Sequence, residues 1–261
     1  LTLNNSWALE PRAGIKWQFS PKSSFALAYG VHSRMEKMDV YFVKTQGTGD
    51  RSVNKDLGFT RAHHVMLSYG FKISDNMNMK IEPYFQQLYD VPVIADSSYS
   101  VLNRRDFYVE NALVNRGKGR NIGVDITLER YLNKGLYYMV TASIFDSKYY
   151  GGDRKWRNTL YNRNFIVNVL GGKEWMVGRD RQNMFSVNFK ITLQGGDRYA
   201  PVDEVATLLD PDREVQYDET KAFSKQFSPM FITNFSVGYK INRKKVSHEF
   251  SIKSLNTTGC E

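Results

Sequence analysis

The sequence predicts an all-β protein, an antiparallel transmembrane β-barrel. Three observations support this. Apolar and polar residues alternate along many segments, the connections between these segments are alternately short and long, and no apolar run approaches the roughly 18 residues of a membrane-spanning helix. The mean hydropathy of −0.48 is that of a hydrophilic chain, but barrel strands interleave polar and apolar residues and give a similar average. A helical membrane protein is therefore excluded, whereas a barrel is not.

The clearest alternation lies in residues 6–33. One parity is mostly apolar and comprises Trp7, Leu9, Ala13, Ile15, Trp17 and Phe19. The other carries the charged and polar residues Glu10, Arg12, Lys16 and Gln18. Because side chains alternate between the two faces of a strand, each set lies on one face of a sheet. About ten strands of this kind are expected, over residues 7–19, 24–32, 59–73, 76–88, 120–132, 136–147, 164–176, 183–195, 229–242 and 245–256.

The connections between these strands are of two kinds. Short ones include "SPKSS", "SDN" and "NKG", whereas long ones cover residues 33–58, 89–119, 148–163 and 196–228. The alternation places every long loop at one end of the sheet, as in outer-membrane barrels, which have tight periplasmic turns and long external loops. Aromatic residues gather towards the strand ends, where such barrels meet the membrane interfaces. These aromatics are Trp7, Trp17, Phe19, Tyr29, Tyr69, Phe71, Tyr138 and Tyr239.

Five stretches occur together in a distinctive order. They are "LEPRAGIKWQFSPKSSFALAYGVHS", "KIEPYFQQLYDVPV", "NRGKGRNIGVDITLERYLNKGLYYMVTASIFDSKYYGGDRKWRNT", "NVLGGKEW" and "GGDRYAPVD". Together they resemble the barrel of TonB-dependent outer-membrane receptors of the Bacteroidetes type, from about residue 7 to residue 256. The resemblance implies a roughly 22-stranded barrel in the bacterial outer membrane, filled by an N-terminal plug that TonB pulls. It also implies active uptake of a nutrient ligand that the sequence does not identify.

The chain departs from that family pattern in length. Only about ten strands are present, no plug or TonB box precedes residue 1, and the sequence ends in "SIKSLNTTGCE" at Glu261. Residues 1–261 are therefore expected to be a fragment, a partial barrel domain without the plug and the last strands. An open sheet of this size would leave two unpaired edges, which are costly in lipid.

Bulk charge and cysteine content narrow the possible partners. The formal net charge is +9, but Lys and Arg are spread along the chain, which predicts no nucleic-acid binding. The single cysteine, Cys260, forms no internal disulfide or multi-cysteine metal site and is expected to be an exposed tail thiol. The expected partners are outer-membrane lipid and lipopolysaccharide, and the TonB system through the missing plug.

Motifs with possible metal or phosphate chemistry are weak. His63 and His64 are adjacent on a strand, so they point to opposite faces and do not chelate one metal ion. "SHEF" at 247–250 lacks the second histidine of a zinc motif, and "GKGRNIG" at 117–123 opens a strand where a dinucleotide fold needs a helix. The carboxylates of 209–219 lack calcium-loop spacing. No catalytic, cofactor or metal residues are expected.

Two groups of charged residues have surface or lumen interpretations. The basic, aromatic loop 149–164 could contact lipopolysaccharide phosphates or an anionic ligand, or remain a solvated loop. The charges expected on the lumen side have mixed sign, which favours internal salt bridges over ligand contacts. These residues are Glu10, Arg12, Lys16, Lys80, Glu82, Asp125, Glu129 and Lys190.

Two alternatives remain beside the receptor interpretation, and both are self-contained ten-stranded barrels. One is an omptin-like protease with His32 and Asp146 near the outer strand ends. The other is a passive pore, although the lumen of so small a barrel is largely filled by side chains. The leading expectation is that the chain is no enzyme and supplies wall and loops.

Overall fold

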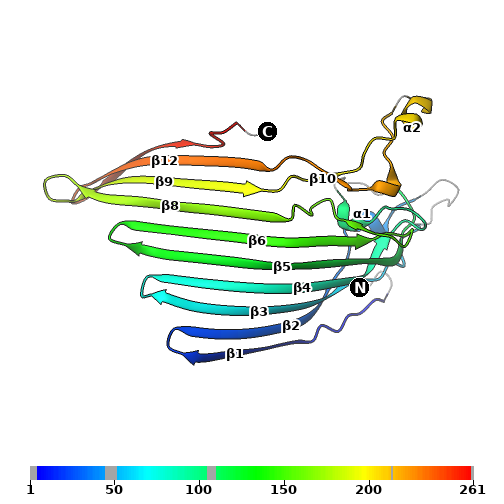
Figure 1. The fold of residues 1–261 in the computed structure, drawn as a ribbon, viewed down its shortest axis with the longest axis horizontal. Helices are drawn as coiled ribbons and strands as arrows, with labels where there is room; N and C mark the ends of the chain where they lie inside the picture. Colours follow the sequence, from blue (N-terminus) through cyan, green and yellow to red (C-terminus); the bar gives the residue numbers. More distant parts are fainter. Residues whose placement is uncertain (1–4, 45–51, 105–109, 213, 260–261) are drawn as a thin grey trace.

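The computed structural model describes residues 5–44, 52–104, 110–212 and 214–259, and ten of its strands form one antiparallel path. The order is β1-β2-β3-β4-β5-β6-β8-β9-β12-β13, and β7 pairs with β6 as an eleventh strand (Figure 1). The first half comprises β1 (Arg12–Ser20), β2 (Ser23–Arg34), β3 (Thr60–Ser74), β4 (Met77–Val93) and β5 (Val114–Asn133). The second half comprises β6 (Leu136–Tyr150), β7 (Trp156–Asn158), β8 (Phe165–Val177), β9 (Asn183–Gln194), β12 (Met230–Asn242) and β13 (Ser247–Ser254).

The predicted all-β class and the ten predicted strands are confirmed, with differences at their ends. The first strand begins at Arg12, not at residue 7, just after Pro11, which has no N–H to donate to a ladder. At the loop end, β4 and β5 continue pairing as far as Val93 and Val114, five or six residues beyond the predicted limits of 88 and 120. Their register shifts between Leu88 and Pro92 let the paired strands bend into the loops.

Short turns gather at one end of the sheet and long connections at the other (Figure 1). The β5–β6 turn shows why the short turns are tight. Lys134 has φ 50° and Gly135 has φ 75°, and positive φ at both central residues is the type I′ arrangement that suits hairpins. A β-carbon on Gly135 would lie 2.2 Å from the carbonyl oxygen of Glu174, so this turn requires glycine.

The long connections carry small elements of their own. They are α1 (Met38–Tyr41), η1 (Val101–Asn103), α2 (Glu204–Leu209), η2 (Glu219–Lys221) and a two-stranded sheet of β10 (Arg198–Tyr199) and β11 (Lys225–Gln226). No helix in the described ranges has the length and apolar character needed to cross a membrane. Cys260 and Glu261 lie outside the described residues.

The hydrophobic core lies among these long connections. Its buried members are Val40, Tyr41, Val43, Leu57, Val91, Val101 and Leu113. They come from α1, the connection after it, the extended end of β4, η1 and the residue just before β5. We call this group the loop core. The sheet itself has large exposed apolar side chains, such as Trp17 at 65% and Ile144 at 64% exposure.

The path of strands is open in the described residues. β1 pairs with β2, β13 pairs with β12, and no pairing joins β1 to β13 within the part of the chain that the structure describes. All eight residues of β13 are exposed. The described sheet is therefore a curved wall with two free edges and not a closed ten-stranded barrel.

Candidate functional site

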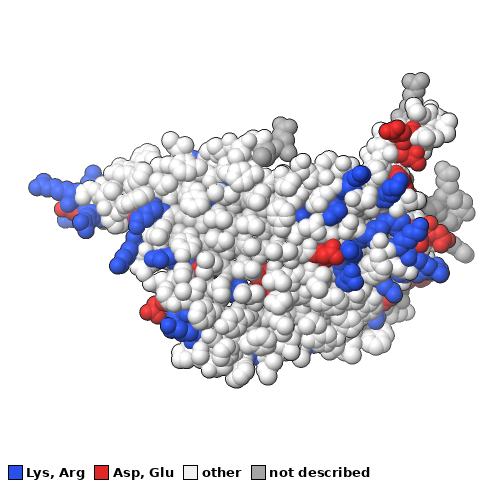
Figure 2. All heavy atoms as spheres, in the orientation of Figure 1, with Lys and Arg blue, Asp and Glu red and all other residues white. Residues whose placement is uncertain are grey.

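The sheet has an apolar face and a polar face, which the strand register defines. Residues paired directly across neighbouring strands share a face. One row of the apolar face contains Phe85, Ile122 and Asp146, and a row nearer its middle contains Pro83, Val124 and Ile144. On the polar face, Gln86 pairs with Asn121, and Asn121 pairs with Ser147. On the face drawn in Figure 2, charged side chains gather towards the two ends, and the band between them is mostly uncharged.

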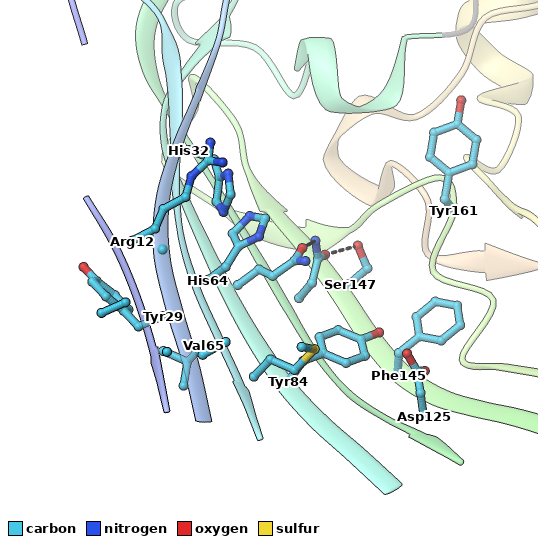
Figure 3. Close-up of a pocket in the computed structure, with 17 residues that line it drawn as sticks. Arg12, Tyr29, His32, His64, Val65, Tyr84, Asp125, Phe145, Ser147 and Tyr161 are labelled. Atoms are coloured by element: carbon cyan, nitrogen blue, oxygen red, sulfur yellow. Dashed lines mark hydrogen bonds between the residues drawn. The ribbon is translucent and has the colours of Figure 1, made fainter. Parts of the chain in front are cut away.

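The polar face of β1 to β6 encloses a hollow of about 780 Å³ below the long connections. The lining includes His32, His64, Tyr84 and Asp125 (Figure 3), and Tyr161 from the loop after β7 lines its edge. A second hollow of about 480 Å³ lies on the same face towards the short turns. It is lined by Lys16, Lys72, Lys80 and Glu129, among others.

The predicted lumen charges lie on this polar face or beside it. Arg12 and Asp125 line the larger hollow, Lys16, Lys80 and Glu129 line the smaller one, Glu82 pairs with Asp125, and Lys190 lines a third hollow beside Asn234. The ion pairs found for this set, Arg12–Glu10 at 2.9 Å and Lys80–Glu82 at 2.8 Å, join residues two apart in sequence. They therefore do not tie neighbouring strands together.

Neutral side chains link the strands across the polar face. Each of three chains of hydrogen bonds is centred on an asparagine, and we call them the asparagine ladders. They are Gln86–Asn121–Ser147, Thr141–Asn168–Thr192 and Tyr137–Asn188–Ser236. In the first, Ser147 Oγ donates to Asn121 Oδ1 at 2.6 Å, and Asn121 Nδ2 donates to Gln86 Oε1 at 3.0 Å (Figure 3). Sequence reasoning missed these ladders, although asparagine on the polar parity of a strand is a signal, since strands are depleted of it.

The adjacent histidines point to opposite faces, as predicted. His63 lies on the apolar face, where its Nδ1 is 2.8 Å from the hydroxyl of Tyr29 and its ring stacks on Tyr89 with centroids 5.2 Å apart. His64 lies on the polar face beside His32, with ring centroids 4.5 Å apart. This second pairing was not predicted, because it depends on the register of β2 against β3.

Three further motifs have structural roles. Residues 117–123 lie inside β5, which begins at Val114, so the motif does not open the strand as predicted. A β-carbon on Gly117 would lie 2.5 Å from a methyl of Val93, so this glycine permits close packing.

His248 is exposed on β13, and Asp210 and Asp218 accept backbone N–H groups of their own loop. Within the described ranges, no three His, Cys, Asp or Glu side chains form a group that could hold a metal ion.

Two arginines of the basic loop 149–164 form ion pairs within the protein. Arg157 is buried and binds Asp153 through both guanidinium Nη atoms, at 2.9 and 2.5 Å. Arg163 binds Asp197 at 2.6 Å. The cations on the apolar side of the loop end come instead from β5. Lys118 lies 5.7 Å from the ring centroid of Tyr150, and Arg120 lies 5.5 Å from that of Trp156.

The proposed protease pair is not brought together. His32 lines the hollow on the polar face, whereas Asp146 pairs with Ile122 on the apolar face. Asp146 Oδ1 also accepts a hydrogen bond from Asn162 Nδ2 at 2.9 Å, and Asp146 Oδ2 lies 3.4 Å from Lys148 Nζ. These two residues therefore form no common site.

Comparisons with known proteins give a structural likeness. No family model matches the chain, and no curated protein does. Among solved structures, the ferric-catecholate import receptor Fiu from E. coli K12 matches with a TM-score of 0.62 and 11% identity over 95% of this chain and 30% of that one. BauA, the ferric preacinetobactin receptor from Acinetobacter baumannii, matches with a TM-score of 0.63 and 9% identity over 95% and 32%. The outer-membrane transporter YddB from E. coli matches with a TM-score of 0.60 and 10% identity over 94% and 36%.

The chain has the fold of part of a TonB-dependent receptor barrel. It spans about a third of the length of the receptors that it matches. In this receptor-barrel fold the apolar face is the one that meets lipid and the polar face lines the lumen. The hollows, the asparagine ladders and the His32–His64 pair all lie on the polar face.

In the receptor-barrel fold the long connections form a bonded layer at one end of the wall. Arg198 donates to the carbonyl oxygen of Asn162 and to Asn164 Oδ1, both at 2.8 Å. The Ser97 hydroxyl donates to Glu219 Oε2 at 3.1 Å, which ties two loops that lie 122 residues apart in sequence. Tyr149, which is fully buried, meets Phe223 edge-on.

The bonded layer of long connections, which we call the loop layer, is expected to be stable at neutral pH and less stable in acid. Hydrogen bonds from Arg157 hold the pKa of Asp153 below its usual range. A carboxyl whose pKa is depressed on folding contributes stability above its unfolded pKa of about 3.9, and loses it as the pH falls through the folded value. The hydrogen-exchange protection factors of residues 149–164, which are corrected for the intrinsic exchange rate at each pH, should be equal at pH 8 and pH 5 and smaller below about pH 4. Asp153→Asn should remove this acid step, and an unchanged step in that variant would assign it to another group.

Proposed function

We propose that this chain is a segment of the barrel of a TonB-dependent outer-membrane receptor, of the Bacteroidetes type that its motifs resemble. The observation that carries the proposal is the long antiparallel wall with one apolar face, which matches receptor barrels over 95% of the chain at TM-scores of 0.62 to 0.64. The segment supplies wall and loops in the outer membrane and performs no covalent chemistry.

The intact receptor would bind a nutrient ligand with its long loops and admit it when TonB acts on a plug in the lumen. The polar hollows of about 780 and 480 Å³ offer a wet surface for such a plug or for passing cargo. The solved neighbours include receptors for ferric siderophores. With 9 to 11% identity to them, the ligand class of this chain is left open.

Lipopolysaccharide is the proposed partner of the apolar side at the loop end. Lys118 and Arg120 lie there with Tyr150 and Trp156, just beyond the apolar rows that contain Ile122 and Val124. Cations at this height meet the phosphates of the outer leaflet, and guanidinium groups bind phosphate well. Arg157 and Arg163 are bound to Asp153 and Asp197 and are not needed for this contact.

The mass and location of the native product test the proposal. An antibody against residues 196–228 should detect, in outer-membrane fractions, a band far heavier than the 30.2 kDa of this chain. Uptake of the receptor's nutrient should stop when a protonophore collapses the inner-membrane proton gradient. A soluble periplasmic product would contradict the proposal. A band near 30.2 kDa in the outer membrane would favour a self-contained small barrel instead.

A further inference from the structure

Two histidines stand side by side on the polar face of the wall. His32 on β2 and His64 on β3 both line the larger hollow, with ring centroids 4.5 Å apart and ring planes at 41° (Figure 3). In the described ranges neither imidazole donates or accepts a side-chain hydrogen bond. Both rings are half-buried. Buried and half-buried polar groups are usually bonded, so this pair has donor and acceptor capacity that the described chain does not use.

The separation of the two rings fits coordination of one metal ion. A zinc- or copper-type ion lies about 2.1 Å from a ligating imidazole nitrogen, and hence about 3.2 Å from the ring centre. Two imidazoles bound at a right angle, as in a tetragonal Cu²⁺ or Ni²⁺ site, then have ring centres about 4.5 Å apart, whereas tetrahedral zinc ligands would have them about 5.2 Å apart. The observed separation is 4.5 Å. His63 cannot join them, because it lies on the opposite face.

The charges around the pair allow a cation to approach. Arg12 also lines this part of the hollow, but its guanidinium is bound to the carboxylate of Glu10 at 2.9 Å. Glu10 in turn accepts the backbone N–H of Ser33, the residue after His32, at 2.7 Å. The carboxylate of Asp125 lines the same hollow. Arg12 and Glu10 are therefore close to neutral as a pair, and one further carboxylate faces the hollow.

We propose that His32 and His64 form a two-histidine site for a divalent transition-metal ion that prefers tetragonal coordination, Cu²⁺ or Ni²⁺. Neutral imidazole suits these ions, and affinity for a nitrogen site peaks at Cu²⁺. Two protein ligands leave the other coordination positions to water or to donor atoms of a cargo molecule. A ferric ion inside a siderophore is already fully coordinated by the siderophore, so it has no free position for these two imidazoles. The place of the site on a transport path rests on the proposed function, whereas ion binding does not.

Copper binding by the native product in detergent tests the site. Buffered Cu²⁺ is titrated against wild type, His32→Ala, His64→Ala and the control His63→Ala, whose imidazole lies one residue away on the lipid-facing side. We expect wild type and His63→Ala to bind one Cu²⁺ with the same affinity. His32→Ala and His64→Ala should bind it at least about tenfold more weakly, because loss of even an outer-shell contact lowers metal affinity by that factor. The electron paramagnetic resonance spectrum of this Cu²⁺ should show two nitrogen ligands.

Two further measurements keep the test decisive. His64→Gln retains a polar side chain of similar reach, and heat-modifiable migration on gels reports whether each variant still forms a barrel. Loss of the Cu²⁺ in folded His64→Gln supports the site. The site would be overturned if His32→Ala and His64→Ala bound Cu²⁺ as tightly as wild type does. It would also be overturned if His63→Ala lost as much Cu²⁺ affinity as those two variants. Failure of the receptor proposal would appear separately, in the fractionation and the protonophore test, and would leave this titration unaffected.

Discussion

Replacing Arg157 by alanine is expected to loosen the loop layer more than any other single change. The Arg157 guanidinium is buried and holds Asp153 through two hydrogen bonds, at 2.9 and 2.5 Å. The same contacts raise the pKa of Arg157 and lower that of Asp153. Removing one partner leaves an uncompensated buried charge, which costs about 3–5 kcal/mol. Arg157 lies in the three-residue β7, which pairs only with the loop end of β6, so the long strands should remain folded.

Limited proteolysis of intact outer-membrane vesicles measures this effect. Local opening of residues 149–164 should increase by roughly 100-fold or more in Arg157→Ala, because each 1.4 kcal/mol is about a factor of ten. Lys155→Ala is the matched control, since Lys155 is an exposed cation of the same loop. The double variant Asp153→Ala/Arg157→Ala should be less sensitive than Arg157→Ala alone, because no charge is left unpaired. Equal cleavage of Arg157→Ala and Lys155→Ala would show that the ion pair does not hold the loop.

Replacing Ile144 by lysine is expected to impair assembly of the barrel in the membrane. Ile144 lies on the apolar face between Val124 and Phe165 and is 64% exposed, so lipid would be its main contact. Lysine on the lipid face costs about 2–4 kcal/mol at the bilayer midplane and less near the interfaces. The amount of heat-modifiable protein in the outer membrane should fall clearly.

Ser143→Lys is the control for that substitution. Ser143 is the adjacent residue of β6 and pairs with Asp125 on the polar face, where a new cation meets a carboxylate and water. Assembly of this variant should stay near the wild-type level. If Ser143→Lys and Ile144→Lys behaved alike, the assignment of the two faces to lumen and lipid would be wrong.

The regular part of this fold could be predicted because alternation is a local signal. Ile122, Val124 and Ile126 identify one face of β5 without any knowledge of its neighbours. The end of a strand is less local. β4 and β5 run on to Val93 and Val114 because they pair with each other there and pack against the loop core. That packing involves Tyr41, from a segment about fifty residues away from Val91.

The candidate sites depended on register and were mostly not predicted. His32 and His64 meet because Gly30, and not its neighbour, pairs with His64. A shift of one residue would move His32 to the other face. The ladder through Asn121 likewise needs two registers at once, those of β4 and β6 against β5. By contrast, the opposite orientation of His63 and His64 follows from adjacency alone and was predicted.

The position of the loop core has a consequence for how the long connections can diversify. Tyr41 comes from the connection after β2, Val101 from the connection after β4, and Leu113 from the approach to β5, yet they share one buried cluster. Changes in such a cluster are coupled and do not add. If only one of these two connections were replaced by its counterpart from a related chain, the buried side chains of the other connection would lose their packing partners. The two connections should therefore be exchanged between receptors as a single cassette.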